Sequence, residues 1–296
     1  MSFFSIIIPT YNRAHLVSRA IESVIAQTFA DWELLVVDDG SKDNTKEVVS
    51  KFLGDSRIQY VYQENAKESA ARNNGISRSK GQFICLLDSD DYYLDHHLQT
   101  LYDRIAQENF QVGVYHTLAT RVYTDKPEKK QIITPLEGKH AVYKIWKNEI
   151  LIHSAAIHRD ITLKHQFRVD IFAGEDTEFF FRVALEYPVF TIEEYTVIYV
   201  IHDSNSEKFY QSKPFYYESR LRYLFVLAEN TEFRKIFPSR FFESRIADMY
   251  RWKAYAHHRE KERVKALGSL FQSVKSDGSY LLKLQTYKDA AIFLIK

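Results

Sequence analysis

Three aspartates at the end of an apolar run are the residues most able to do chemistry in this sequence. The run FICLLDSDDYY, residues 83–93, brings Asp88, Asp90 and Asp91 within four positions. Carboxylates this close repel one another unless a cation offsets the repulsion. Hard divalent ions such as Mg²⁺ and Mn²⁺ prefer oxygen ligands and keep coordination positions for phosphate oxygens. The cluster therefore predicts a Mg²⁺ or Mn²⁺ site that holds a diphosphate-bearing ligand. The alternative, that Asp91 or Asp95 caps a following helix, requires only one acid.

Alternating strand and helix patterns in the first ninety residues position these acids. The stretches 3–8, 33–37 and 58–62 predict strands, and the run that opens with FICLL predicts a fourth. Strand–helix–strand units of this length predict a parallel sheet, in which ligands gather beyond the carboxyl ends of the strands. The polar stretches PTYNR, DDGS and DSDD follow the first, second and fourth strands. We therefore expect them to meet at one edge of one sheet.

The pattern loosens after about residue 113 and then becomes helical. Short strands are expected near 111–117 and 121–124, followed by a helix over EDTEFFFRVALEY and a strand at TVIYVIH. Residues 1–214 hold 24 Lys and Arg against 30 Asp and Glu, whereas residues 215–296 hold 16 against 9. We expect a catalytic-type domain over 1–214 and a basic helical region over 215–296. The basic charge of the second region is too diffuse to predict a nucleic-acid partner.

Composition is that of a globular protein in a reducing compartment. The chain is 45% hydrophobic and 27% charged, and no apolar run approaches the roughly 18 residues that a membrane span needs. Cys85 is the only cysteine and lies in the apolar run, so no disulfide framework is expected. The start, MSFFSIIIPTYNR, lacks the basic region of a signal peptide and is interrupted by Pro9. We expect a cytoplasmic location, with peripheral contact at the inner face of the membrane as a second expectation.

Five motifs carry a resemblance to a known family. SIIIPTYNR, LLVVDDGSKDNT, ARNNGISRSKG, FICLLDSDD and AGEDTEFFFRV occur in this order. Together they resemble the inverting, family 2 nucleotide-sugar glycosyltransferases of GT-A fold, over about residues 3–205. The resemblance implies an α/β fold with a Rossmann-like, mostly parallel sheet flanked by helices. The region after residue 214 matches no motif of the family, and its pattern alone predicts a helical C-terminal extension. It implies metal-dependent transfer of one sugar from a nucleoside diphosphate donor, with UDP expected, to a hydroxyl of a saccharide or lipid-linked acceptor.

The resemblance assigns the nucleotide to the ends of the first two strands. Thr10 and Tyr11 would lie along the base and ribose, with Pro9 fixing the turn. Asp39 would hydrogen-bond the base, expected to be uracil, with Asp38 nearby. Two plainer interpretations stay open: Tyr11 packs in the core, and Asp38 only makes a turn.

The helix before the fourth strand carries two further nucleotide-binding candidates. Arg72 and Asn73, in ARNNG, would reach the base or the phosphates according to the resemblance. The alternative for Arg72 is an ion pair with Glu68 at helical spacing, which contributes only tenths of a kcal/mol.

The acidic cluster matches the DXD signature of the family through Asp88 and Asp90. In that signature one acid meets the ribose side and another meets the metal. Asp91 extends the pattern, so which carboxylate holds the ion stays open. His202, in IHDSNS, matches a position that helps hold the metal or diphosphate in some relatives. A structural role for this histidine is an equal alternative.

The family pattern places the catalytic base at Asp176, in GEDTEF, with Glu175 as second choice. In an inverting transfer such a base removes the proton of the acceptor hydroxyl while its oxygen attacks the sugar. The plainer interpretation is that both acids favour the start of a helix.

Other classes of protein fit the sequence less well. A haloacid dehalogenase-type phosphatase carries its acids after an N-terminal strand, a dinucleotide oxidoreductase needs G-x-G-x-x-G, and a P-loop is absent. A sugar nucleotidyltransferase would need a glycine-rich basic loop where PTYNRAHLV stands. It stays open as an alternative, as does a non-catalytic protein that binds nucleotide-sugars.

The basic C-terminal region has three interpretations: packing on the rest of the chain, dimer formation, or contact with an anionic membrane. Trp252 and Tyr255 lie among Lys and Arg residues there and are the candidates for membrane contact. We expect packing first and weak membrane contact second. The donor sugar, the acceptor and the oligomeric state have no signature in the sequence, and the acceptor pocket is expected within 113–174.

Overall fold

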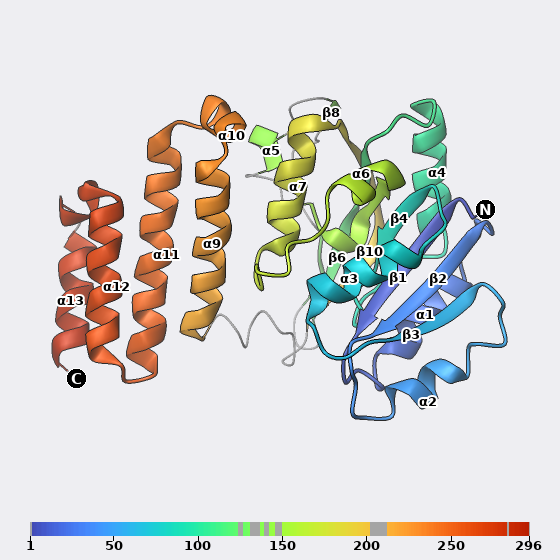
Figure 1. Cartoon of the computed structure of the whole chain (residues 1–296), viewed down its shortest axis with the longest axis horizontal. Coiled ribbons are helices and arrows are strands. Elements are labelled where there is room, and N and C mark those ends of the chain that lie inside the picture. The colour runs from blue at the N-terminus through green and yellow to red at the C-terminus, as the bar shows by residue number, and fades with distance from the viewer. Residues whose placement is uncertain are drawn as a thin grey trace. The chain divides into compact units, whose positions relative to one another are not determined.

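The computed structural model describes residues 2–123, 127–130, 137–138, 142–145, 150–201, 212–282 and 284–295. The chain forms two compact units (Figure 1). The sheet unit comprises Met1–Val169 and Phe179–His202. The helical unit comprises Asp170–Glu178 and Asp203–Lys296. The short segment 170–178 therefore packs with the C-terminal helices, although in the sequence it stands between two segments of the sheet unit.

The first half of the sheet is parallel, as the sequence predicts. Its strands run in the order β3-β2-β1-β4 and are joined through α1, α2 and α3. The strands are β1 (Phe4–Thr10), β2 (Trp32–Asp38), β3 (Ile58–Tyr62) and β4 (Phe83–Leu86). The helices are α1 (Val17–Ile25), α2 (Thr45–Ser50) and α3 (Glu68–Arg78).

The second half of the sheet is mixed. β9 pairs antiparallel with both β4 and β6, β6 pairs parallel with β10, and β5 pairs antiparallel with β10. Its elements are β5 (Tyr92–Tyr93), β6 (Val114–Tyr123), β7 (Lys129–Lys130), β8 (Glu137–Gly138), β9 (Ala155–His158) and β10 (Val189–Ile201), with α4 (His97–Gln107), α5 (Val142–Ile145), the 3₁₀ helix η1 (Ile152–Ser154), α6 (Arg159–Lys164) and α7 (Glu175–Glu186). The α/β fold with a mostly parallel sheet flanked by helices is confirmed.

The expectation of two short strands near 111–117 and 121–124 is wrong. The structure has one continuous strand, β6, because β10 pairs with it from Val114 to Tyr123. The irregular stretch of sequence is bridged by register shifts within β10 between Thr191 and Val197.

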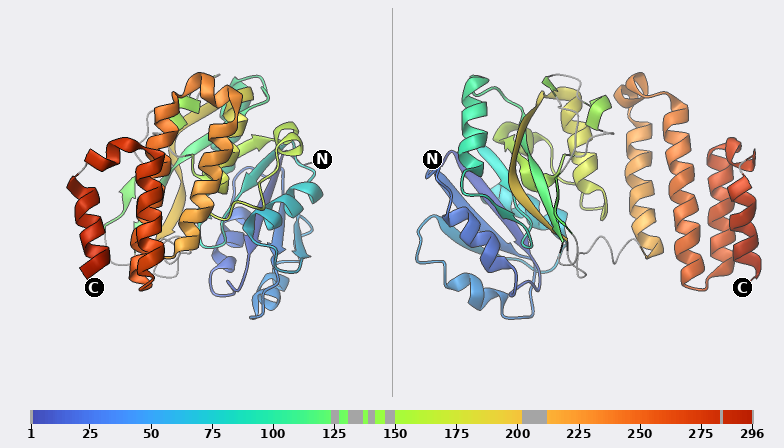
Figure 2. Two further views of the ribbon diagram at one scale, coloured as in Figure 1. Left: turned by 60° about the vertical axis from the view of Figure 1, so that its left-hand side comes forward. Right: turned by 180° about the vertical axis from the view of Figure 1, so that it is seen from behind.

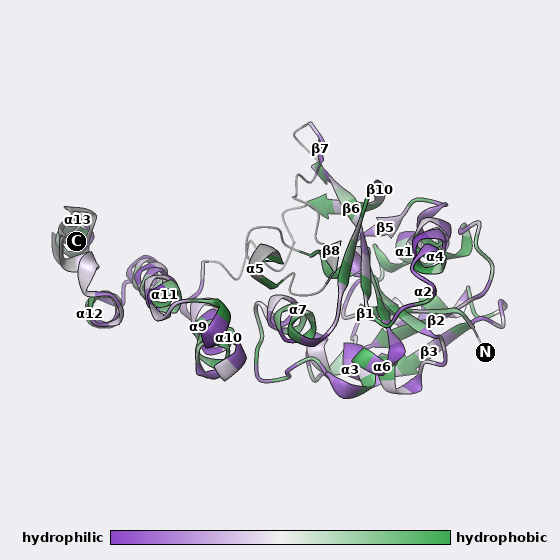
Figure 3. Cartoon of the chain, turned by 90° about the horizontal axis from the view of Figure 1, so that it is seen from above, coloured by the Kyte–Doolittle hydropathy of each residue, from purple (hydrophilic) through white to green (hydrophobic). Residues whose placement is uncertain are grey.

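The core lies on both faces of β1, β2 and β4, so these strands are mainly apolar. Ile6 and Ile8 pack in one cluster with residues of α1 and α4, such as Ala20 and Leu101. On the other face α3 lies against β1 and β2, where a Cβ on Gly75 would come within 2.5 Å of Ile7. Hydrophobic residues predominate along the strands in Figure 3.

The helical unit is a row of helices. α9, α11, α12 and α13 stand side by side in Figures 1 and 2. Its elements are α9 (Pro214–Glu229), α10 (Thr231–Ile236), α11 (Ser239–Arg259), α12 (Arg263–Ser276), the 3₁₀ helix η2 (Gly278–Leu282) and α13 (Leu284–Ile295). Ala254 of α11 packs with Ala266 and Leu270 of α12. The helical pattern expected after residue 214 is confirmed. Among the described helices, none is long and apolar enough to cross a membrane.

Candidate active site

The polar stretches after β1, β2 and β4 meet at one edge of the sheet, as expected. Thr10 is the register partner of Asp38, and the backbone N–H of Asp39 donates to the Thr10 carbonyl at 2.9 Å. On the other side of β1, the backbone N–H of Leu87 donates to the Ile7 carbonyl at 3.0 Å. Parallel pairing therefore places the acids after β4 beside the loops after β1 and β2.

The loops after β1 and β2 are tied into one rim. The side-chain oxygen of Asn12 accepts a hydrogen bond from the Lys42 N–H at 2.8 Å, and the Asn12 N–H donates to Ser41 Oγ at 2.8 Å. Next to this link, Tyr11 is exposed, whereas Thr10 is buried. Tyr11 therefore does not pack in the core, and its ring is available at the rim.

Asp38 and Asp39 are both buried but serve different neighbours. Asp38 accepts hydrogen bonds from the Ser41 N–H at 2.8 Å and the Tyr60 hydroxyl at 2.6 Å, so it does stabilise the turn. The Asp39 carboxylate binds the segment 63–67. It accepts from Gln63 Nε2 at 2.7 Å, the Ala66 N–H at 2.8 Å and the Lys67 N–H at 2.9 Å. Because an ionised carboxylate has about four acceptor positions, Asp39 keeps capacity for one more donor.

Asp88 is held by a buried arginine. Arg72 Nη2 lies 3.0 Å from Asp88 Oδ1 and 2.6 Å from Glu68 Oε1, so the ion pair with Glu68 that was the plainer interpretation is present, together with a second one to Asp88. Burial raises the pKa of Asp88, but Arg72 and His153 more than offset this and hold the pKa below its ordinary value. Asp88 is therefore ionised at neutral pH.

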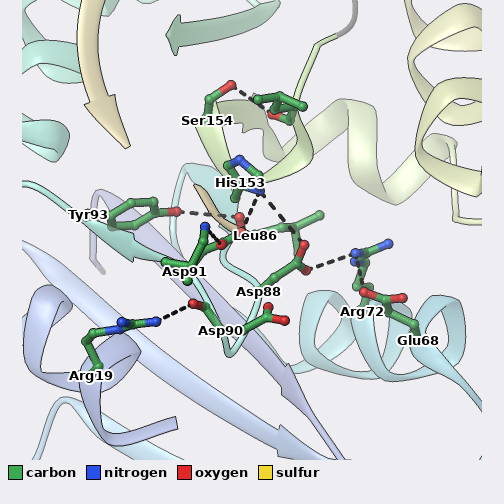
Figure 4. A network of polar contacts seen from close by, with 12 residues as sticks. Arg19, Glu68, Arg72, Leu86, Asp88, Asp90, Asp91, Tyr93, His153 and Ser154 are labelled. Carbon is green, nitrogen blue, oxygen red and sulfur yellow. Dashed lines mark hydrogen bonds and ion pairs between the residues drawn. The ribbon is translucent and has the colours of Figure 1, made fainter. Parts of the chain in front are cut away.

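Asp91 is fully enclosed and forms an ion pair with His153 (Figure 4). Its Oδ1 accepts a hydrogen bond from the Val200 N–H at 2.8 Å, and its Oδ2 lies 3.0 Å from His153 Nδ1. Burial raises the pKa of Asp91 to about 6. Burial lowers the pKa of His153, but the Asp91 and Asp88 carboxylates outweigh it and raise that pKa to about 10. Near neutral pH the carboxylate and the imidazolium are both charged.

His153 is the residue of this site that sequence reasoning missed. It lies in η1, more than sixty residues along the chain from the acids, in a stretch that we assigned to the acceptor pocket. No local spacing links it to Asp91. The available signal was the antiparallel strand AAIH that follows it, since β9 pairs with β4 through Cys85 and Ala156 and so brings η1 beside the acids.

Asp90 differs from Asp91 in its neighbours and in its exposure. Arg19 Nη2 donates to the backbone carbonyl of Asp90 at 2.6 Å, and Arg13 Nη2 lies 4.0 Å from Asp90 Oδ2. The exposed fractions of the Asp88 and Asp90 side chains are 26% and 16%, against 1% for Asp91. Asp88 and Asp90 are thus the two acids of the cluster that a ligand can reach.

The donor atoms suit a hard divalent ion. Carboxylate oxygens of Asp88 and Asp90 are the ligands that Mg²⁺ and Mn²⁺ prefer. Among the described residues, Asp88, Asp91 and His153 also offer ligand atoms that all lie within 4.8 Å of one another. An ion bound to His153 would first have to displace its proton, because metal ligation requires neutral imidazole. The accessible oxygens of Asp88 and Asp90 are therefore the better fit.

The side-chain amide of Asn73 binds backbone in this structure. Its Nδ2 donates to the Phe167 carbonyl at 2.8 Å, and its Oδ1 accepts from the Phe167 N–H at 2.9 Å. The Arg72 guanidinium lies over the Phe167 ring, 5.6 Å from its centroid. The two residues therefore join α3 to the segment that leads towards residue 170.

The candidate bases lie in the first turn of α7, in the part of the chain that belongs to the helical unit. Asp176 Oδ1 accepts a hydrogen bond from the Thr177 N–H at 2.6 Å, whereas Glu175 is buried. The structure thus brings together, within the sheet unit, the predicted site residues at the ends of β1 and β2, those of α3, and those of residues 88–91, which we call the DXD loop. His202 lies outside the described residues.

The fold is shared with proteins of known structure. TarS of S. aureus in complex with UDP-GlcNAc matches with a TM-score of 0.70 at 16% identity, over 99% of this chain and 88% of that chain. The mannosyltransferase PcManGT from Pyrobaculum calidifontis, in complex with GDP-Man and Mn²⁺, matches with a TM-score of 0.61 at 13% identity, over 98% and 84%. At these identities the likeness defines the class of fold, which is GT-A.

The family follows from the sequence comparison. The model of glycosyl transferase family 2 matches residues 5–165, more than half of the chain, so the chain belongs to that family. It is 41% identical over 133 residues to the Escherichia coli UDP-Glc:alpha-D-GlcNAc-diphosphoundecaprenol beta-1,3-glucosyltransferase WfgD, covering 44% of this chain and 52% of the relative. It is 40% identical over 113 residues to the Campylobacter jejuni GalNAc(5)-diNAcBac-PP-undecaprenol beta-1,3-glucosyltransferase, covering 37% and 36%. The chain thus matches about half, or less, of the length of these curated relatives.

Proposed function

We propose that the chain is an inverting glycosyltransferase that moves one sugar from a nucleoside diphosphate donor to a hydroxyl of a saccharide or lipid-linked acceptor. The observation that carries this proposal is the pair of accessible carboxylates, Asp88 and Asp90, beside the rim formed by the loops after β1 and β2. The names of the two bacterial relatives, which act on diphosphoundecaprenol-linked glycans, support a lipid-linked acceptor. The UDP-GlcNAc bound to TarS supports UDP as the nucleotide.

The donor nucleotide would lie along the edge of the sheet. Tyr11 would contact the base or ribose from the rim, and Asp39 would accept a hydrogen bond from the base with its remaining acceptor capacity. Asp88 and Asp90 would hold Mg²⁺ or Mn²⁺, which when bound offsets the negative charge of the diphosphate. Arg72 would keep the Asp88 carboxylate ionised and oriented.

Asp176 would act as the general base, with Glu175 as the second candidate. It removes the proton of the acceptor hydroxyl, whose oxygen forms the new bond to the anomeric carbon. The bond to the nucleoside diphosphate breaks on the opposite face of the sugar, and that group leaves with the electron pair. No covalent intermediate with the protein is needed, and the anomeric configuration inverts.

A thermal-stabilisation screen tests the donor site. UDP-, GDP- and dTDP-sugars are each added with and without Mn²⁺, and the correct donor raises the melting temperature only with the ion. Asp90→Ala is expected to abolish this shift, because it removes an accessible carboxylate. The control is Asp95→Ala, a nearby exposed aspartate. If no nucleotide-sugar stabilises the wild type, or Asp90→Ala responds like the wild type, the assignment is wrong.

Membrane contact through the C-terminal helices is a separate proposal. Trp252 is exposed on α11, whereas the hydroxyl of its neighbour Tyr255 donates to Asp289. Of these two rings, Trp252 is therefore the one that can insert at a lipid surface. Co-sedimentation with vesicles rich in anionic lipid should fall in Trp252→Ala. Equal binding of the two proteins would exclude this contact.

A further inference from the structure

Helix α9 holds the segment that carries the proposed base. The hydroxyl oxygen of Ser219 accepts hydrogen bonds from two successive backbone groups, the Phe172 N–H at 2.7 Å and the Ala173 N–H at 2.9 Å. Ser219 is buried, so solvent does not compete for these bonds. A hydroxyl offers two acceptor lone pairs, and both are used here. The chain just before Asp176 is therefore fixed by one side chain of the C-terminal region.

The same face of α9 continues this contact. Residues 216, 219 and 223 follow the helical spacing that places side chains on one face. Tyr216 packs in a cluster with Ala173. Gly174 adopts φ +87°, and a Cβ on it would lie 3.1 Å from the Tyr223 ring. A side chain other than hydrogen at residue 174 would thus be both strained and in close contact with Tyr223.

An ion pair adds a further link between α9 and this segment. Arg222 Nε lies 3.0 Å from Asp170 Oδ2 at the start of the segment. Arg220 donates a hydrogen bond to the Tyr216 hydroxyl at 2.9 Å. Burial lowers the pKa of Arg220, but Tyr223, Tyr216 and, least of the three, Asp176 raise that pKa above its ordinary value.

We propose that Ser219 is a positioning residue for the proposed catalytic base, so that the C-terminal helices form part of the catalytic apparatus. The inference rests on the proposed role of Asp176. Ser219 touches neither donor nor acceptor in this mechanism. It sets the backbone at 172–173, and this backbone sets where the first turn of α7 begins. A small misplacement of a reacting group can cost a large factor in rate while substrate affinity is kept.

Three variants test the inference. Ser219→Ala removes the shared acceptor, and Ser219→Thr restores a hydroxyl. The matched control is Ser273→Ala, a buried serine of the same unit whose hydroxyl donates to the Ala247 carbonyl at 2.7 Å, away from residues 170–178. We expect Ser219→Ala to lower kcat about ten- to hundredfold with the donor KM within about twofold of the wild type. Ser219→Thr should recover most of kcat, and Ser273→Ala should keep it. Equal kcat in Ser219→Ala and the wild type, or equal losses in Ser219→Ala and Ser273→Ala, would overturn the inference.

Hydrogen exchange separates this inference from the proposed function. The amides of Phe172 and Ala173 should exchange slowly in the wild type, in Ser219→Thr and in Ser273→Ala, and about tenfold or more faster in Ser219→Ala. This readout needs no activity. A wild type that transfers no sugar but shows this pattern contradicts the catalytic assignment and with it the catalytic part of the inference. An active wild type with unchanged exchange in Ser219→Ala contradicts the inference alone.

Discussion

His153 Nδ1 lies 3.0 Å from Asp91 Oδ2, and both side chains are buried at the end of β4. This ion pair joins η1 to the DXD loop, while Asp91 Oδ1 joins the loop to β10 through the Val200 N–H. Asp91 therefore has a different environment from Asp88 and Asp90, although the three acids lie within four positions of the chain. Two acids are partly exposed, and the third is buried and fastens the loop that carries them.

Removing the carboxylate of this pair should destabilise the protein. Asp91→Asn leaves a buried imidazolium whose remaining carboxylate, Asp88, lies 3.9 Å away. Breaking a buried ion pair from one side typically costs about 3–5 kcal/mol in the free energy of unfolding. Urea unfolding at pH 7 with a chelator present measures this cost. Asp90→Asn is the matched control, because its partly accessible side chain should cost less than about 1 kcal/mol. Equal stability of the two variants would show that the pair does not fasten the loop.

The proposed base predicts a separation of binding from turnover. Asp176→Asn should keep the affinity for the donor, measured by calorimetry, while sugar transfer falls about 10²- to 10⁴-fold, because the acceptor proton has no carboxylate to receive it. Glu175→Gln is the comparison, since the buried neighbour should support folding more than chemistry. Normal turnover in Asp176→Asn would move the base to another residue.

Two helical glycines should respond in opposite directions to alanine. In Gly75→Ala the new Cβ would lie 2.5 Å from Ile7 Cγ2 and 3.1 Å from Val37 Cγ2, so we expect a loss of about 1–3 kcal/mol. At Gly268 of α12 an added Cβ would have no neighbour within 4 Å, so Gly268→Ala should stabilise the helix by about 0.5–1 kcal/mol. Urea denaturation of both variants checks the signs. A stabilised Gly75→Ala would mean that α3 can move away from β1.

A buried neutral histidine should make the protein sensitive to mild acid. His116 Nε2 lies 2.8 Å from the Thr191 hydroxyl oxygen, and burial lowers the His116 pKa from 6.5 to about 4. The unfolded chain takes up a proton below pH 6.5 while the folded protein does not. The stabilisation from neutral His116 is therefore complete above pH 6.5 and is lost as the pH falls towards 4.

Between pH 7 and pH 5 this residue accounts for a loss of about 2 kcal/mol in the free energy of unfolding. His116→Gln should show a correspondingly smaller loss over the same interval in urea titrations. The control His15→Gln, at an exposed histidine, should lose as much as the wild type. If His116→Gln and His15→Gln have the same pH dependence, His116 is not the group responsible.

Much of the fold was predictable because its signals are local. Short, mainly apolar stretches identified β1 to β4, and the helical patterns between them required a parallel order. That order alone placed Thr10, Asp38 and Asp88 at one edge of the sheet. The error at β6 had a different cause: whether the chain continues as a strand near residue 118 depends on pairing with β10, about seventy residues later.

The sequence by itself determined which residues lie at the edge of the sheet, because the alternation of strands and helices is a local pattern. It also determined which family the chain resembles, because the motifs and their order are properties of the sequence. Only the tertiary structure decided how three neighbouring aspartates differ in burial, since Asp91 is enclosed beside Val200 and His153, far away in sequence, whereas Asp88 and Asp90 stay partly exposed. In the same way, the hydrogen bonds from residues 172–173 to Ser219 span more than forty positions. Burial and hydrogen bonding act between residues that are far apart in sequence. Local spacing therefore predicts neither the burial of Asp91 nor the hydrogen bonds to Ser219.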